Sequence, residues 1–142
     1  KNKTTGQAGE RMAAHYLRMN GYSILECNFA MHRVGEIDIV AKKGEFLVCV
    51  EVKTRYSQAV PMAALVPRSK QRNIVLAARH FVQLHRYFNM VVRFDVVLVD
   101  LSDNEPMVAH FPNAFYGFDA TTNKMVLAEG EEQRGSQCLN AR

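Results

Sequence analysis

Two apolar strand patterns joined by a short turn constrain the fold of this chain more than any other feature. Residues 35–41 and 46–53 are rich in valine, isoleucine and other apolar side chains, as expected of strands buried in a sheet. Between them, Gly44 and Glu45 fit a two-residue type II′ turn, which favours glycine at its first position. The sequence therefore predicts a tight antiparallel hairpin.

The register of this hairpin brings ionisable side chains together. It predicts that Asp38 lies opposite Glu51 and that Glu36 lies opposite Lys53. Adjacent carboxylates repel one another unless a cation lies between them, and an oxygen site with open positions suits Mg²⁺ or Mn²⁺. Lys53 would then orient or activate the attacking water, or stabilise charge on a phosphate. The alternative is a cross-strand ladder of charges on a solvated face.

Length and composition predict one modest domain without a membrane segment. We expect a single domain over residues 1–125 of the 142 and a flexible tail over 126–142. No apolar run approaches membrane-spanning length, and the basic first residues lack the apolar segment of a secretory signal. The three cysteines are widely spaced and favour free thiols in a reducing cytoplasm over a disulfide framework or a zinc site.

Charge is distributed unevenly along the chain. No acidic residue occurs between Glu51 and Asp95, an interval that holds eight lysines and arginines from Lys53 to Arg93. Acidic residues predominate after Asp95. A local basic region of this kind attracts phosphates without reading sequence.

The remaining patterns predict an αβββαβ order with a trailing strand. Helices are expected over about 6–20, capped by Thr4 or Thr5 and ended by Gly21, and over 68–88. The other expected segments are a strand over 22–29, a loop over 56–67, a central strand over 91–100 and an edge-like strand over 107–111. This order predicts an α/β fold, a three-layer sandwich around a mixed sheet.

Some charged residues on the two helices stand out. Arg68, Arg72 and Arg79 share one face of the second helix, which is typical either of a solvated face or of a nucleic-acid contact. Lys70 instead falls on the apolar face, and Glu10 on the first helix leans toward the core side.

Several blocks of the chain resemble the YraN-type family, small bacterial proteins regarded as candidate endonucleases. The resemblance covers about residues 6–116. It rests on Gly9-Glu10, Gly21-Tyr22, the Gly35-Glu-Ile-Asp-Ile-Val-Ala41 block, the Val50-Glu-Val-Lys-Thr-Arg55 block, Lys70, Arg93-Phe-Asp-Val-Val97 and Asn113-Ala114-Phe115. The resemblance implies a restriction-endonuclease-like fold, similar to that of Holliday-junction resolvases.

The same resemblance implies roles for individual residues. Asp38 and Glu51 would be metal ligands, with the backbone carbonyl of Val52 as a third, and Lys53 would be the catalytic lysine. Glu10 would complete the site from the first helix, and Lys70 would act from the second. The chain departs from the family at residues 30–33, where a more basic approach is expected and Arg33 is the residue available to supply it.

The leading hypothesis is a Mg²⁺-dependent (or Mn²⁺-dependent) endonuclease that hydrolyses phosphodiester bonds in DNA, with branched or damaged DNA as candidate substrates. Arg55, Arg72 and Arg79 would bind flanking phosphates. A nucleic-acid-binding or adaptor module that does not cleave is the second hypothesis, and a purely structural charge cluster is the third. The choice between DNA and RNA stays open, and symmetric cleavage of a junction would require a homodimer.

Overall fold

The computed structural model describes residues 3–57, 66–126 and 137–138 of the chain. The elements are α1 (Lys3–Met19), β1 (Ser23–Met31), β2 (Gly35–Lys43), β3 (Phe46–Arg55), α2 (Arg68–His85), β4 (Val91–Asp100), β5 (Met107–Asp119), β6 (Met125–Val126) and β7 (Gln137–Cys138). Neither helix in these ranges is long and apolar enough to span a bilayer. Cys27 on β1 and Cys49 on β3 are free thiols, the first exposed and the second buried.

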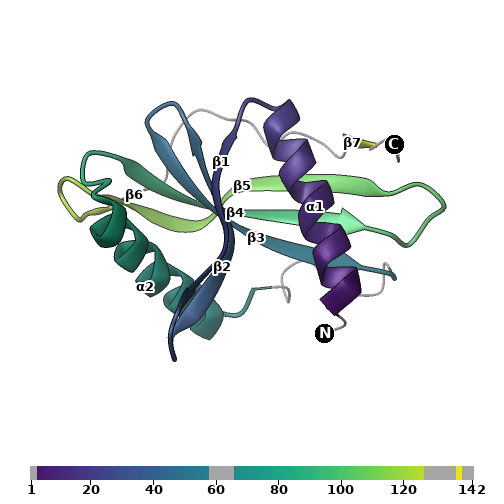
Figure 1. Cartoon of the computed structure of the whole chain (residues 1–142), viewed down its shortest axis with the longest axis horizontal. Helices are drawn as coiled ribbons and strands as arrows, with labels where there is room; N and C mark the ends of the chain where they lie inside the picture. The colour runs from purple at the N-terminus through teal and green to yellow at the C-terminus, as the bar shows by residue number, and fades with distance from the viewer. Residues whose placement is uncertain (1–2, 58–65, 127–136, 139–142) are drawn as a thin grey trace.

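One mixed sheet forms the middle layer, with its strands in the order β1-β2-β3-β4-β5-β6 (Figure 1). Neighbouring strands are antiparallel except β3 and β4, which are parallel because α2 provides the crossover between them. The two helices pack on opposite faces of the sheet. The predicted α/β order and mixed sheet are therefore confirmed.

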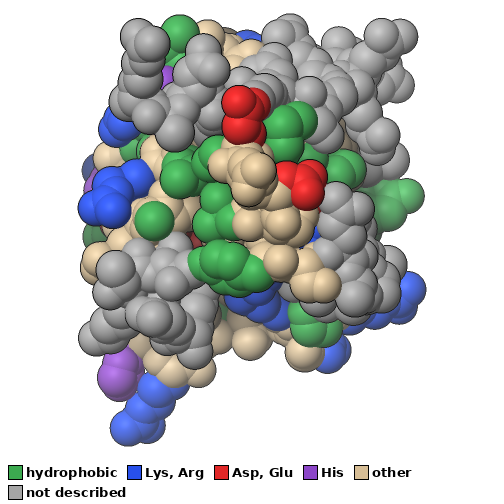
Figure 2. All heavy atoms as spheres, turned by 90° about the vertical axis from the view of Figure 1, so that its right-hand side faces the viewer, with side chains coloured by type: hydrophobic (Ala, Val, Ile, Leu, Met, Phe, Trp, Pro, Cys, Tyr) green, Lys and Arg blue, Asp and Glu red, His purple; other side chains and the backbone are tan. Residues whose placement is uncertain are grey.

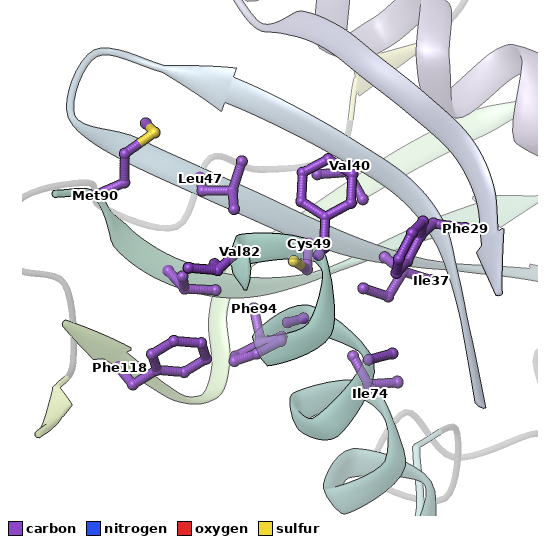
Figure 3. Close-up of a cluster of buried hydrophobic side chains, with 14 residues drawn as sticks. Phe29, Ile37, Val40, Leu47, Cys49, Ile74, Val82, Met90, Phe94 and Phe118 are labelled. Atoms are coloured by element: carbon purple, nitrogen blue, oxygen red, sulfur yellow. The ribbon is translucent and has the colours of Figure 1, made fainter. Parts of the chain in front are cut away.

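Each face of the sheet has its own apolar core. On the α2 face, Phe29, Leu47, Phe94 and Phe118 from the sheet pack with Ile74 and Val82 of the helix (Figure 3). On the α1 face, Leu17 and its neighbours pack on valines of β3 and β4. Strand β3 contributes to both cores, since alternate side chains point to opposite faces.

The helix boundaries differ from the predicted ones by a few residues. Helix α1 begins at Lys3, so the predicted caps Thr4 and Thr5 lie inside it. Helix α2 begins at Arg68 as predicted but ends at His85, because Arg86 adopts a left-handed conformation with a φ of 61°. The backbone N–H of Arg86 donates to Val82 O and closes the last turn.

Strand β5 is the largest correction. It runs from Met107 to Asp119, well beyond the predicted 107–111, and pairs with β4 along most of its length. The pairing passes from Val96↔Phe111 to Phe94↔Phe115, so β5 has extra residues where Pro112 would otherwise end a strand. This bulge lets the strand continue past a proline, which the sequence pattern did not indicate.

Parts of the predicted loop and tail lie outside the described residues. Residues 58–65 of the loop and most of the predicted tail are in this category, although Val126 and Gln137–Cys138 pair with β5.

The end of the molecule where β4 leads into β5 shows hydrophobic side chains at its centre, acidic ones among them, and Lys and Arg mainly toward the margin (Figure 2). Among the described residues, the basic side chains near the predicted site lie along α2 rather than at this end of the molecule.

Candidate active site where two strands separate

Strands β2 and β3 pair near their turn and then separate. The predicted register is confirmed over this first part, where Val40 pairs with Cys49, and the φ of 58° at Gly44 has the sign that a type II′ turn requires. The ladder ends at Ile39↔Val50. Beyond it, the Asp38 carboxylate accepts the backbone N–H of Val52 at 2.8 Å.

The predicted cross-strand pairs therefore need correction. Asp38 does not continue the ladder opposite Glu51, because its carboxylate replaces a strand carbonyl as the partner of Val52. Glu36 pairs with Ala30 of β1 and is exposed, so the ladder does not place it opposite Lys53. The β2–β3 ladder therefore stops before Asp38 and Glu51.

Glu51 is the centre of the site. Its side chain is buried, with 3% of the residue exposed, and it faces α2 because its neighbours Val50 and Val52 pack on the α1 side. Oε1 of Glu51 lies 2.6 Å from Nζ of Lys70 and 3.3 Å from Nζ of Lys53. The structure thus brings together Asp38, Glu51, Lys53 and Lys70, which we call the split-strand site.

A glycine at the start of β2 helps to position Lys70. A Cβ atom on Gly35 would lie 3.1 Å from Cβ of Asn73, tighter than an ordinary contact. Glycine therefore lets the first turns of α2 approach the beginning of β2 closely. This approach directs Lys70 from its place on the apolar face of the helix toward Glu51.

The two lysines respond differently to the same carboxylate. Burial lowers the pKa of Lys53 below its ordinary value, and the neighbouring Lys70 ammonium adds to this, while Glu51 opposes it. Burial also acts to lower the pKa of Lys70, but the contact with Glu51 outweighs it and the net pKa is raised. Lys70 is thus the firm counter-charge of Glu51, and Lys53 is the lysine that more easily gives up a proton.

Glu10 approaches the sheet from the opposite face. Its neighbour Gly9 abuts Thr54 of β3, and a Cβ there would lie 2.2 Å from Oγ1 of Thr54. The Glu10 charge also contributes to the raised pKa of Cys27 on β1, for which burial is the larger cause. Glu10 therefore lies near β1 and the end of β3 on the α1 face, whereas Glu51 faces α2.

The donor chemistry of the split-strand site fits a hard divalent cation. Oε1 of Glu51 is buried, and its contacts with Nζ of Lys70 and of Lys53 are ion pairs that do not meet hydrogen-bond geometry. Mg²⁺ prefers such carboxylate oxygens, and Asp38 and the carbonyl of Val52 are the further donors at hand. No trio of His, Cys, Asp or Glu in the described ranges could hold a metal alone. Water and phosphate would fill the remaining positions, and Lys70 would compete for Glu51.

A family profile described as "Uncharacterised protein family UPF0102" matches residues 9–99. The chain belongs to the UPF0102 family. A UPF0102 protein of Geobacter metallireducens is 44% identical over 115 residues, which cover 80% of this chain and 93% of the relative. One of Dehalococcoides mccartyi is 41% identical over 114 residues, covering 79% and 93%. The region matched by the UPF0102 profile includes the whole split-strand site and Glu10.

The predicted phosphate-binding arginines have different surroundings. Arg72 of α2 is exposed, and Arg33 is exposed in the turn before β2 with a φ of 64°. Arg55 is engaged with Asp100, whose Oδ2 lies 2.9 Å from both Nε and Nη2 of the arginine. The guanidinium of Arg79 lies 4.2 Å from the centre of the Phe118 ring and also donates to Asn123.

A second buried polar cluster lies on the α1 face, and sequence reasoning gave it no role. Asp95 accepts two hydrogen bonds from Arg93, at 2.9 and 2.8 Å, and one from His110 at 2.7 Å. Tyr16 lies 3.3 Å from Nδ1 of His110, and Arg93 donates to the Tyr22 hydroxyl at 2.5 Å. We call these five side chains the Arg93 network.

Part of the Arg93 network was visible in the sequence. Arg93 and Asp95 share one face of an otherwise apolar strand, a pattern that indicates a buried ion pair. His110 follows in β5. Its partner Tyr16 is 94 positions away, so local patterns could not reveal the contact.

Proposed function

We propose that this UPF0102 protein is a Mg²⁺-dependent endonuclease that hydrolyses phosphodiester bonds in DNA, with branched or damaged DNA as its candidate substrates. The observation that carries the proposal is the buried Glu51 carboxylate beside Asp38, flanked by two lysines. A buried carboxylate oxygen that lacks an aligned donor, as Oε1 of Glu51 does, costs stability. Such an arrangement is more useful for chemistry than for folding, and the YraN-type resemblance supports the same function.

Each side chain of the site would have its own role in the reaction. A bound Mg²⁺ would withdraw charge from the phosphate and lower the pKa of a coordinated water. Asp38 and Glu51 would hold the cation, and Asp38 is already fixed by the N–H of Val52. Lys53, with its lowered pKa, would hold or release a proton at Nζ and stabilise charge on the phosphate.

A second function is favoured by one specific contact. Lys70 occupies the same Glu51 oxygen that a cation would need, at 2.6 Å. If Lys70 is not displaced, the protein would bind nucleic acid through its basic side chains without cutting it. This binding-module function predicts affinity that depends on Arg72 and on salt, with no effect of divalent metal.

A cleavage panel tests the proposal. Four-way junction, flap, single-stranded and duplex DNA are incubated with Mg²⁺ or Mn²⁺ and either the wild type, Asp38→Asn or Lys53→Ala. We expect metal-dependent cutting by the wild type and a loss of at least about a hundredfold in both variants. Asp103→Asn is the matched control, because Asp103 is exposed in the β4–β5 connection.

Two outcomes would contradict the proposal. Equal cutting by the wild type and Asp38→Asn would indicate a contaminating nuclease. Salt-dependent binding by the wild type without cutting any substrate in the panel would favour the binding module.

A further inference from the structure

We infer that the groove between α2 and the β5–β6 edge binds an unpaired stretch of a nucleic-acid strand. The inference deepens the proposed function by naming its substrate class, and in that respect it rests on the proposed function. Two hollows lie between α2 and this edge, one of about 770 Å³ and one of about 310 Å³, and we treat them together as the groove. The larger hollow is lined chiefly by Arg68, Arg72, Leu76, Phe115, Tyr116 and Met125.

One wall of the groove is basic. Arg68 and Arg72 of α2 line the larger hollow, and Arg79 of the same helix lines the smaller one. These positions span about 16 Å along the helix. Helix α2 carries no acidic residue, and neither hollow has one in its lining. The wall therefore has the charge that a phosphate backbone requires.

The opposite wall is aromatic. Tyr116 of β5 is 56% exposed, which leaves its ring available to a ligand. Its neighbour Phe115 is stacked on Phe94 with ring centres 5.0 Å apart and an interplanar angle of 13°, so this part of β5 is fixed from within. An exposed aromatic ring across from a row of arginines suits a stacked base whose neighbouring phosphates lie on the helix.

This combination favours an unpaired strand over other occupants. The bases of a continuous duplex are stacked on one another, so their faces cannot reach a ring within a groove. An acidic peptide would use the arginines but would leave Tyr116 without a stacking partner. A second copy of this chain would have to bury the arginines of α2 against matching acidic groups.

The groove and the split-strand site lie on opposite sides of the same turns of α2. Lys70 lies between Arg68 and Arg72 in the chain, yet it points to Glu51 while they line the groove. DNA with an unpaired segment, such as a flap or a gap, would therefore bind in the groove more readily than continuous duplex.

The test measures binding separately from cleavage. Fluorescence anisotropy in EDTA compares a labelled oligothymidylate with a blunt hairpin duplex for the wild type, Tyr116→Ala, Tyr116→Phe and Arg72→Ala. We expect Tyr116→Ala to weaken binding of the single strand on the order of tenfold and Tyr116→Phe to leave it unchanged. Arg72→Ala should reduce the salt dependence by about one unit of slope. Arg18→Ala is the charge-matched control, since Arg18 is exposed on α1 across the sheet.

Each outcome separates this inference from the proposed function. Weaker single-strand binding in Tyr116→Ala, with Arg18→Ala unchanged, supports the groove even if no cleavage is found. Unchanged binding in both Tyr116→Ala and Arg72→Ala overturns it, even if Asp38→Asn abolishes cleavage. Equal loss of duplex and single-strand affinity in Tyr116→Ala also overturns the inference. So does a Leu76→Asp variant that changes from dimer to monomer while its DNA affinity stays intact, because the groove would then be a dimer interface.

Discussion

The two buried polar clusters of this protein, one on each face of the sheet, use similar groups in opposite ways. In the Arg93 network, the Asp95 carboxylate accepts four hydrogen bonds, two from Arg93 and one each from His110 and the N–H of Asn113. In the split-strand site, Oε1 of Glu51 faces two ammonium groups, and neither meets hydrogen-bond geometry with it. We call the Arg93 network closed, because its carboxylate is hydrogen-bonded within the network and to the backbone. We call the split-strand site open, because Oε1 of its buried carboxylate has no aligned donor.

Burial follows the same division. The side chains of Arg93, Asp95 and His110 are at most 5% exposed. Those of Lys53 and Lys70 are 23% and 41% exposed. A closed network stabilises the fold because each partner offsets the desolvation of the others, whereas an open one leaves charge available to a ligand. The difference teaches that burial of charge alone does not mark a functional site.

The largest expected effect is that of Asp95→Asn. This change leaves the Arg93 guanidinium buried without its counter-charge, and we expect the free energy of unfolding to fall by about 3–5 kcal/mol. Urea denaturation followed by circular dichroism measures the loss, with exposed Asp103→Asn as the control. A loss below about 1 kcal/mol would show that the network does not stabilise the fold.

An alkaline pH should weaken the fold through Cys49, which is buried on β3. Burial raises the pKa of its thiol far above the ordinary value of 9.0, and the Asp95 charge adds to the shift. The stability that the neutral, buried thiol contributes is complete below about pH 9. It is lost at higher pH, because only the unfolded chain then ionises the thiol. We expect Cys49→Val to remove about 1–2 kcal/mol of the stability loss near pH 10. Urea denaturation at neutral and alkaline pH measures this difference. Equal alkaline losses of stability in the wild type and in Cys49→Val would contradict the prediction.

A smaller effect is expected for Tyr16→Phe. The change removes one hydroxyl from the closed network, so that Nδ1 of His110 loses its partner from α1. We expect destabilisation of about 1 kcal/mol, the usual size for a buried neutral hydrogen bond. Tyr56→Phe, at an exposed tyrosine, should have no measurable effect in the same urea titration. If the two variants behave alike, the contact between Tyr16 and His110 does not hold α1 in place.

The smallest expected change in stability is that of Glu51→Gln, the same acid-to-amide change as Asp95→Asn. Because Lys53 and Lys70 are partly in water, we expect the free energy of unfolding to change by less than about 1 kcal/mol. The variant should, however, lose any rise in melting temperature that Mg²⁺ gives the wild type. A loss as large as that of Asp95→Asn would make Glu51 a structural residue and weaken the proposed function.

The sequence indicated the hairpin of the split-strand site correctly up to the point where the strands separate. The glycine turn and the alternation of side chains are local, so the pairing of Val40 with Cys49 followed from them. Separation beyond Ile39 could not be predicted, because it depends on the Asp38 carboxylate replacing a backbone partner of Val52. Lys70 stood out as a charge on an apolar face, but only the packing of α2 revealed its partner.

The sequence by itself determined the order of the elements, the mixed α/β class and the hairpin that carries Asp38 and Glu51, since these depend on residues near one another in the chain. The tertiary structure alone decided the contacts of Tyr16 and His110 in the Arg93 network, the ion pair between Glu51 and Lys70, and the groove that places Tyr116 across from the arginines of α2. Side-chain periodicity tells which face a residue occupies, but not which distant residue packs against that face. That choice belongs to the packing of α1, α2 and the long, bulged β5 on a single sheet.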